Sequence, residues 1–311
     1  MPSFSYRSQL HLPGFTSNVD LVNITRAGFS RVDAAAAHPI EYAVVTAVLA
    51  PIALHYALHS RTRAMRLGCW AALACLFAVT PMTVSRSGVL ALVVCLAVYA
   101  PALTARHRLN ALLLVPVALL AFSAAVPGLL GTLRSLFFAG SQDPSIAGRE
   151  ADYAKLPGLL QGHEIFGRGL GTFQPAQYFF LDNQYLGTWI EAGAVGLVAL
   201  VALFLVGMGT ARGARKWATD VETRSLGQAL AAAIAGLAIT GGTFDQMSFR
   251  QSQFLVFLLI GCAGSLWWMQ RGPLDAASVG ATADPAVGGS DVVGQSREQA
   301  PHRARSRTHR R

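Results

Sequence analysis

Long apolar runs separated by short polar connections fill this sequence from residue 39 to residue 270. Most runs come close to the roughly 20 residues that a helix needs to cross a hydrocarbon core about 30 Å thick. The apolar residues are continuous rather than alternating, which favours helices over the strands of a membrane barrel. The pattern predicts about seven transmembrane helices, at 39–59, 66–84, 88–105, 109–131, 184–209, 225–244 and 251–270.

These helices divide the chain into five parts. An N-terminal segment, 1–38, precedes four helices within 39–131, and a large polar loop occupies 132–185. Three more helices follow within 186–270, and the tail, 271–311, has a composition that predicts disorder. The expected fold is therefore an all-α, polytopic membrane helix bundle with one large extracytoplasmic loop.

Composition agrees with a membrane location, and charge predicts an orientation. Hydrophobic residues make up 53% of the 311 residues and charged residues only 13%, with a mean hydropathy of +0.42, which excludes a soluble domain of this size. Basic residues gather in alternate connections, around 61–66, 106–108 and 212–224, and again in the tail. The positive-inside rule assigns these segments to the cytoplasm and the large loop to the outside.

This orientation leaves the N-terminus outside, although residues 1–37 contain no apolar run of spanning length and no signal-peptide pattern. We therefore expect the chain to be the C-terminal part of a longer protein with further transmembrane helices upstream. Six arginines between Arg297 and Arg311 are expected to hold the tail near the anionic inner leaflet rather than on nucleic acid.

Charged residues at the outer helix ends are the candidates for chemistry. Arg86 lies at the junction of two apolar runs, where a guanidinium is either an interfacial anchor or a phosphate ligand. Arg149 lies in the large loop, where a single arginine is usually only solvated. Asp182 precedes the fifth helix and is either its N-cap or a catalytic carboxylate. Glu191, two turns into that helix, must face the protein interior or a cavity.

Three further residues complete the candidate set. His163 is a potential general base, but a lone loop histidine beside Glu164 is more often ordinary surface. Arg168 belongs to GRGLGTF, which lacks the strand and helix of a dinucleotide-binding loop and whose glycines instead suit sharp backbone turns. Arg250 follows the last outward turn, where it can pair with Asp245 or line the site.

Four segments, taken in order, resemble the O-antigen ligase and polysaccharide polymerase family. They are RAGFSRVDAAAAHPIEYA before the first helix, SRSG at an outer junction, an arginine followed by IFGRGLGTF in the loop, and DNQYLGTWIEAGAVG at the fifth helix. The resemblance covers about residues 26–270. It implies a helical glycosyltransferase of the bacterial inner membrane that transfers a glycan from an undecaprenyl-diphosphate carrier, without a nucleotide sugar or a required metal.

The resemblance also implies roles for the candidate residues. Arg86 and Arg149 would bind the diphosphate leaving group, and Asp182 would take the proton of the acceptor hydroxyl. The other candidates are expected to bind substrate: Glu191, His163, Arg168 and Arg250. The implied partners are a lipid-linked glycan donor, a glycan acceptor, the bilayer and other polysaccharide-assembly proteins, and no cofactor is expected.

Asp182 distinguishes this chain from lipid A-core ligases, which resemble it but place a histidine near the start of this helix. The aspartate is more similar to polymerase-type members, so the sequence favours polymerisation of an exopolysaccharide, capsule or related repeat unit. A transporter or flippase of lipid-linked sugars is the alternative from another class, although it predicts more polar residues at mid-depth than this chain contains. An inactive fragment of a polymerase is a third hypothesis.

Overall fold

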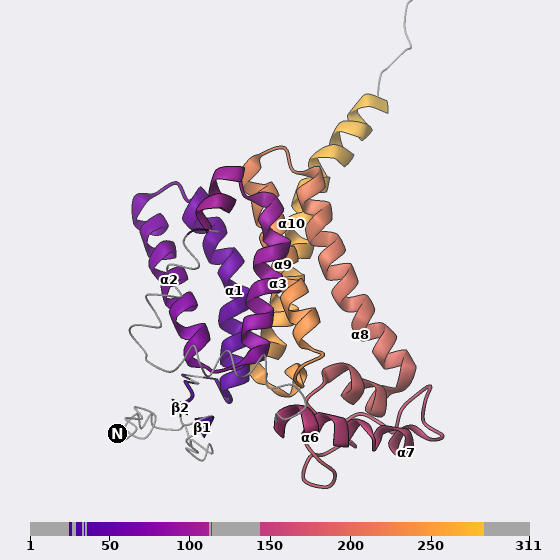
Figure 1. Ribbon diagram of the computed structural model, residues 1–311. Coiled ribbons are helices and arrows are strands. Elements are labelled where there is room, and N and C mark those ends of the chain that lie inside the picture. Colours follow the sequence, from indigo (N-terminus) through magenta and orange to yellow (C-terminus); the bar gives the residue numbers. More distant parts are fainter. Residues whose placement is uncertain are drawn as a thin grey trace, which may run out of the picture. The chain divides into compact units, whose positions relative to one another are not determined.

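A computed structural model of the chain describes residues 25–26, 29–32, 34, 36–111, 113 and 144–282. The described part is almost entirely helical, as Figure 1 shows, which confirms the predicted all-α membrane fold. Its strands, β1 (Thr25–Arg26) and β2 (Phe29–Ser30), have two residues each and pair antiparallel, with Thr25 opposite Ser30.

Six long helices form the described bundle. They are α1 (Pro39–His59), α2 (Arg63–Met82), α3 (Arg86–Tyr99), α8 (Gln184–Trp217), α9 (Val221–Thr240) and α10 (Arg250–Thr282). Short helical segments are η2 (Ala100–Ala102), α6 (Pro144–Tyr153), α7 (Leu156–Leu160) and η4 (Gln246–Ser248).

Of the helices in the described part, four are long and apolar enough to cross a membrane: α1, α2, α8 and residues 250–271 of α10. Helix α3 with η2 forms a shorter apolar segment. The predicted helix at 109–131 lies almost wholly outside the described residues. The expected number of seven transmembrane helices therefore stays a prediction.

Capping side chains set where the first and third helices begin. Pro39 occupies the first turn of α1, and Nδ1 of His38 accepts a hydrogen bond from the Ile40 N–H at 3.1 Å, so the His-Pro pair begins this helix. The Ser85 hydroxyl caps α3 by accepting from the Gly88 N–H at 3.3 Å. The SRSG motif is therefore a helix start.

Helix α9 lies inside the bundle and packs against α1, α3 and α8. Its residues from Ala229 to Leu237 are buried, and most are alanine or glycine. Small side chains let neighbouring helices approach closely. A Cβ on Gly236 would lie 2.5 Å from Cys95 Sγ of α3 and 3.0 Å from Val48 Cγ1 of α1. The helix predicted at 225–244 is thus enclosed by other helices rather than by lipid.

The two ends of the bundle differ in what connects the helices. Figure 1 shows α6 and α7 at one end, at the bottom of the view, and the α1–α2 and α8–α9 connections at the opposite end. Helix α10 continues past the predicted limit of residue 270 to Thr282, and the chain divides after Gly272 into two compact units. Tail residues 283–311 lie outside the described residues.

A buried carboxylate ties α1 to α10 at the end that carries α6. Glu41 is 1% exposed, and its Oε1 accepts from the N–H groups of Gln251 and Ser252 at 2.8 and 3.3 Å. Its Oε2 accepts from the Ala37 N–H at 2.9 Å. The carboxylate satisfies donors in the first turn of α10, where the helix dipole favours negative charge. Sequence reasoning missed this residue.

Candidate active site

Helix α8 is interrupted near its start, just after the large loop. Gly193 has φ 67° and ψ −168°, a conformation outside the helical region that is nearly restricted to glycine. The break leaves backbone N–H and C=O groups that a continuous helix would pair internally. Because buried backbone groups need partners, another segment must supply them.

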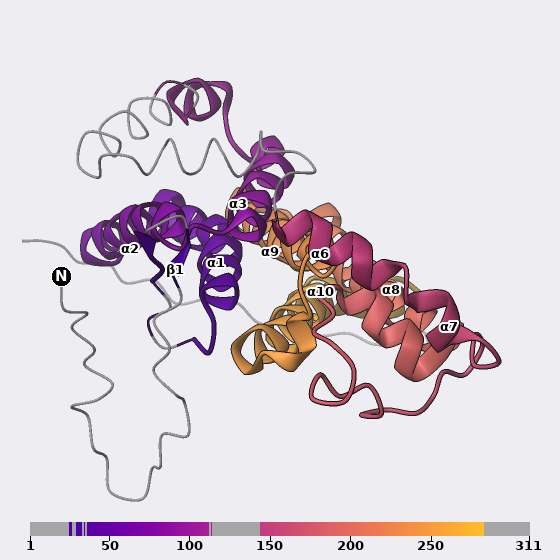
Figure 2. The ribbon, with the colours of Figure 1, turned by 60° about the horizontal axis from the view of Figure 1, so that its bottom comes forward.

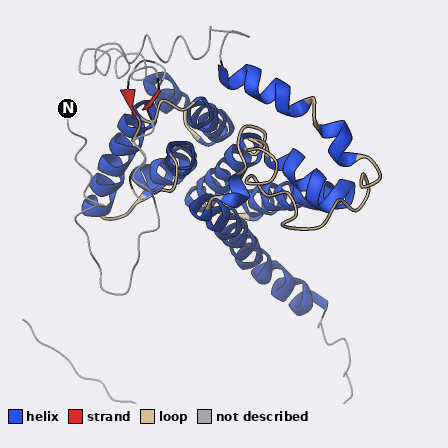
Figure 3. Cartoon of the chain, turned by 90° about the horizontal axis from the view of Figure 1, so that it is seen from below, coloured by secondary structure: helices blue, strands red, loops and turns tan. Residues whose placement is uncertain are grey.

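Residues 164–169 of the loop supply these partners. Four backbone hydrogen bonds of 2.8–3.2 Å join the two segments, written donor first: Arg168 to Ile190, Gly169 to Glu191, Ala194 to Glu164 and Val195 to Ile165. The Trp189 ring N–H donates to the Glu164 carbonyl at 3.1 Å. Figure 3, viewed from this end, shows the tan loop after α7 returning to the bundle. The loop thus completes the broken helix.

Two glycines make this contact possible because neither carries a side chain. A Cβ on Gly167 would lie 2.3 Å from the Glu191 carbonyl oxygen, and a Cβ on Gly193 would lie 2.1 Å from the Ile165 carbonyl oxygen. Both glycines have positive φ, 73° and 67°. The prediction that the loop glycines permit sharp turns is confirmed for Gly167. The helix break at Gly193 was not predicted.

The side chains of Arg168 and Glu191 hold the remainder of the loop. Arg168 donates through Nη2 to the Tyr178 hydroxyl at 3.0 Å, and its guanidinium carbon lies 5.3 Å from the centre of that ring. Oε1 of Glu191 accepts from the Phe173 N–H at 3.2 Å. Phe173 stacks on Tyr178 with ring centres 5.2 Å apart. Both residues anchor the loop, and their contact with substrate stays a prediction.

Asn183, not Asp182, caps helix α8. Its Oδ1 accepts from the N–H groups of Tyr185 and Leu186 at 3.0 and 3.2 Å, and its Nδ2 donates to the Tyr153 hydroxyl of α6 at 3.2 Å. The alternative interpretation of Asp182 as the N-cap is therefore wrong. Its role as a catalytic carboxylate stays a prediction.

Gln184 joins the start of α8 to the turn between α9 and α10. The Gln184 N–H donates to the Gly241 carbonyl at 2.8 Å, and its Oε1 accepts from the Met247 N–H at 2.7 Å. Figure 1 and Figure 2 show α6 and α7 at this end of the bundle, by the start of α8. Asp182 therefore belongs to the place where the loop, α8 and the α9–α10 turn meet.

Two carboxylates from these segments, Asp182 and Glu191, act on a third, Asp245. Burial raises the pKa of Asp245 above its ordinary value, the charges of Glu191 and Asp182 raise it further, and a hydrogen bond from the Ser248 hydroxyl opposes them. In the described part of the chain, acids, histidines and cysteines form no cluster that could hold a metal ion. Asp245 was predicted to pair with Arg250 or to line the site, and it thus joins the candidate site.

Gln246, the next residue, is buried without a partner. Its side chain is 0% exposed, and neither its amide oxygen nor its amide nitrogen has a hydrogen-bond partner within the described residues. A buried polar group left unsatisfied costs about 1–3 kcal/mol. Gln246 is therefore a donor and acceptor that a bound polar molecule could satisfy. Sequence reasoning missed it, because a turn glutamine gives no signal of its burial.

Arg86 is the first residue of helix α3. A hydrogen bond and close packing position this helix start. The Arg31 Nε–H donates to the Thr83 carbonyl at 2.8 Å. Gly88 packs so closely on α1 that an added Cβ would lie 2.5 Å from the Ala43 Cβ. Arg86 itself is half-buried. Backbone N–H groups and the dipole favour anions at a helix N-terminus, so this position suits the predicted phosphate contact.

The remaining predicted residues come from separate segments. Arg149 belongs to α6, but its side chain lies outside the described residues. His163 is exposed, and its Nδ1 shares a hydrogen bond with the Gln161 carbonyl at 3.1 Å. Arg250 is exposed at the first position of α10. Their predicted roles in substrate binding or catalysis stay predictions.

An apolar pocket of about 250 Å³ lies between α8 and α9. Its lining residues are Tyr185, Val201, Phe204, Leu205, Met208, Ala238 and Ile239. The Tyr185 hydroxyl donates to the Ala238 carbonyl, which joins the two helices at the pocket. Tyr185 follows Asp182 by three residues, so the pocket adjoins the start of α8 where the carboxylates gather.

Residues 71–201 match a family model described as O-Antigen ligase. The match extends over most of α2, all of α3, the large loop and the first part of α8. It includes both glycines of the loop contact and two of the three carboxylates. A comparison with curated proteins finds no match. The chain therefore carries, over residues 71–201, a domain of the O-antigen ligase family.

Proposed function

We propose that this protein is a membrane glycosyltransferase that joins lipid-linked oligosaccharide repeat units for a cell-surface or secreted polysaccharide. The O-antigen ligase domain supports a role in polysaccharide assembly at a membrane. The observation that carries the proposal is the group of carboxylates formed by Asp182, Glu191 and Asp245, two of them inside that domain. We expect the protein in a bacterial inner membrane with the large loop outside.

The proposed reaction transfers a glycan from undecaprenyl diphosphate to a sugar hydroxyl. The hydroxyl oxygen attacks the anomeric carbon of the donor sugar while the bond from that carbon to the diphosphate oxygen breaks. Asp182 takes the hydroxyl proton, and Arg86 and Arg149 neutralise the charge that develops on the diphosphate. Asp245 is a second carboxyl at this end of the bundle, and its raised pKa, caused first by burial, means that it binds a proton more tightly than an exposed aspartate does.

The apolar pocket between α8 and α9 supports a lipid-linked donor. Its lining side chains are apolar apart from the Tyr185 hydroxyl, and it adjoins the start of α8. A prenyl chain in this pocket would keep its diphosphate near the same end of the bundle. Because Asp182 stands where lipid A-core ligases have a histidine, we favour polymerisation over ligation.

The test is an assay in membranes that contain the full chain and a lipid-linked repeat unit. Asp182→Asn and Arg149→Ala should each lower the rate of polymer formation by about 100-fold or more, since general-base and charge-stabilising groups contribute about that much. Immunoblots should show unchanged amounts of protein in the membrane. The measurement is the polymer length distribution on gels.

Asp152→Asn is the matched control, because Asp152 is a loop aspartate whose partner is Lys155, at 2.9 Å, rather than the carboxylate group. It should leave the length distribution unchanged. Normal polymer from the Asp182→Asn and Arg149→Ala variants would refute the assigned roles.

A further inference from the structure

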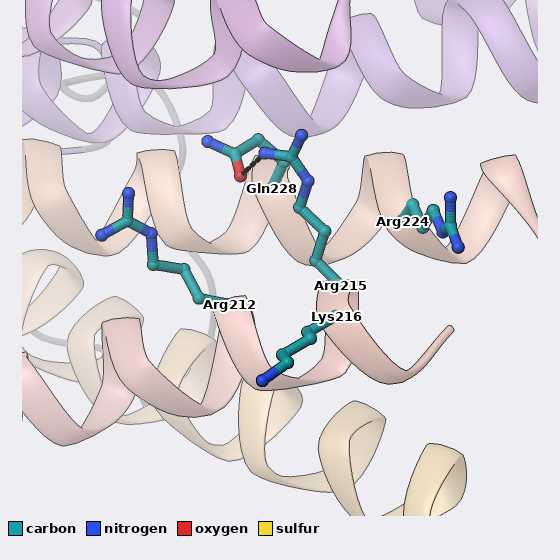
Figure 4. A pocket seen from close by; sticks show the side chains of 5 residues that line it. All are labelled: Arg212, Arg215, Lys216, Arg224 and Gln228. Carbon is teal, nitrogen blue, oxygen red and sulfur yellow. Dashed lines mark hydrogen bonds between the residues drawn. The ribbon is translucent and has the colours of Figure 1, made fainter. Parts of the chain in front are cut away.

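A second cavity lies where α8 ends and α9 begins, at the end of the bundle opposite the candidate active site. Its volume is about 340 Å³. Figure 4 shows the five side chains that line it: Arg212, Arg215, Lys216, Arg224 and Gln228. Four of the five are cations from two helices that meet at a short connection.

Positive charge predominates in this cavity. None of its lining residues is acidic, and none of the four cations forms an ion pair with a carboxylate in the described part of the chain. The acid whose charge acts on Arg224 is Asp220, which caps α9 by accepting from the Thr223 N–H at 2.7 Å. A second acid, Glu222, lies in the first turn of α9. The four cations outnumber these two acids, so the cavity attracts anions.

Two of the guanidinium groups are held in place by neutral partners. Arg215 donates through Nη1 to Oε1 of Gln228, a side chain only 2% exposed, and Nε2 of Gln228 donates to the Val98 carbonyl of α3. The Arg224 Nε–H donates to the Ala218 carbonyl at 2.9 Å. Because these bonds fix the side chains before any ligand arrives, less conformational entropy is lost on binding.

Close helix packing supports the same arrangement. A Cβ on Gly227 would lie 2.8 Å from the Ala211 carbonyl oxygen and 3.0 Å from the backbone nitrogen of Arg215. The glycine thus lets α9 pack closely against α8 at Arg215. Close packing of the two helices therefore helps to position the residues that line the cavity.

Tryptophans mark this end of the bundle as the level of lipid headgroups. Trp217 is exposed at the end of α8, 5.9 Å from the Lys216 Nζ, and Trp268 of α10 is 71% exposed. Trp267 packs against Gly213 of α8. Tryptophan is enriched at membrane interfaces, where an amphipathic ring lies between water and hydrocarbon. A phosphate in the cavity would therefore lie at headgroup depth.

We propose that this cavity binds the phosphate of an anionic membrane lipid in the leaflet opposite the candidate active site. The planar guanidinium fork matches phosphate oxygens, and basic pockets between membrane helices recognise anionic headgroups. The cavity is a different site from the one proposed for the lipid-linked glycan, and its lipid is a regulatory or structural ligand rather than a substrate.

The test uses the purified full chain in lipid nanodiscs, with bound lipid measured by native mass spectrometry. Wild-type protein should retain phosphatidylglycerol in preference to phosphatidylcholine. The variant Arg212→Gln/Arg215→Gln/Arg224→Gln should retain phosphatidylglycerol at least about tenfold more weakly. Arg61→Gln/Arg63→Gln/Arg66→Gln is the control, because it removes the same charge from exposed positions at the α1–α2 connection, away from the cavity.

Equal losses in the two triple variants would overturn the proposal, since they would show general charge attraction only. It would also fail if inorganic phosphate stabilised lipid-free protein through the same three arginines while phosphatidylglycerol was not retained, because the ligand would then be a soluble anion. If the triple variant does not fold, Arg212→Gln alone changes an exposed side chain and should still weaken retention.

Discussion

The two ends of helix α8 bind their surroundings in different ways. At the N-terminal end backbone hydrogen bonds from a loop replace those that the helix loses at Gly193, in addition to contacts made by side chains. At the C-terminal end the helix is regular and the contacts are made by long basic side chains around a cavity. Added side-chain volume should therefore lower the stability of the protein when it is placed at the first end. Removal of charge at the second end should weaken anion binding.

At the candidate site, the residues that hold the structure together differ from those proposed to carry out the chemistry. The backbone contact holds Glu191 and the loop in position, while the carboxylates beside it supply the chemistry. A change to the backbone contact should damage folding first and activity as a consequence. A change to a carboxylate should damage activity and leave the fold largely intact.

The largest effect on folding is expected from Gly193→Ala and Gly167→Ala. Each substitution forces a side chain into a left-handed or extended positive-φ conformation and places a Cβ about 2 Å from a carbonyl oxygen. Backbone strain of about 1–3 kcal/mol adds to overpacking of about 1–3 kcal/mol, so we expect a loss of about 2–6 kcal/mol of stability. Thermal unfolding in detergent, followed by tryptophan fluorescence, measures it.

Gly187→Ala is the control on the same helix, because a Cβ at Gly187 meets no atom within 4 Å. It should be neutral or slightly stabilising, since alanine favours helices. If all three variants unfold at the same temperature, the loop does not depend on close backbone approach and the contrast between the two ends of α8 fails.

An intermediate effect is expected from Glu41→Ala, which tests whether the end with the broken helix also depends on a side chain. The substitution leaves buried N–H groups at the start of α10 without their acceptor. We expect a loss of about 1–3 kcal/mol of stability, measured by the same unfolding assay.

Glu41→Gln retains one acceptor oxygen and should lose less stability than Glu41→Ala. Glu222→Ala, which removes an exposed acid from the first turn of α9, should change stability little. Equal losses in Glu41→Ala and Glu222→Ala would show that Glu41 acts only through general charge.

The helical parts of the fold could be predicted because local sequence determines them. The apolar run bounded by His38-Pro39 gave the first helix at the observed limits, 39–59. The limits of α8 were less accurate: it continues to Trp217 rather than 209, because alanine and arginine favour helix even where hydropathy falls. Polar residues end a lipid-buried segment without ending a helix.

The candidate site could be predicted only in part, because its geometry depends on contacts between distant segments. Asp182 and Glu191 were predicted as site residues from their place at one helix start, whereas the charge relation with Asp245 joins residues more than 50 positions apart. The helix break at Gly193 could not be predicted for the same reason, since sequence does not distinguish a glycine within a regular helix from a glycine at a helix break. Only the approach of residues 164–169 distinguishes them.

The smallest effect is expected from Asp245→Asn, which tests whether the Asp245 carboxyl binds a proton more tightly in the folded protein. The pKa of Asp245 is raised from its ordinary value of 3.8, so the folded state binds this proton more tightly than the unfolded chain does. Stability from this group is therefore lost as pH rises from the ordinary value through the raised one. Asparagine cannot ionise and can still accept the Ser248 hydrogen bond. The variant should gain stability over wild type as the pH increases.

Melting temperatures measured from about pH 4 to about pH 8 test this sign, because the linkage depends only on the difference in bound protons between the two states. Asp182→Asn should change the profile in the same direction but less, since it removes only one of the two charges that raise the pKa of Asp245. Asp152→Asn, whose partner is a lysine, should not show the same gain. Parallel profiles for wild type and Asp245→Asn would mean that the pKa of Asp245 is not raised in the folded protein. If the Asp182→Asn profile were parallel to that of wild type, the charge of Asp182 would not act on Asp245, and the chemistry proposed for this end of the bundle would lose its support.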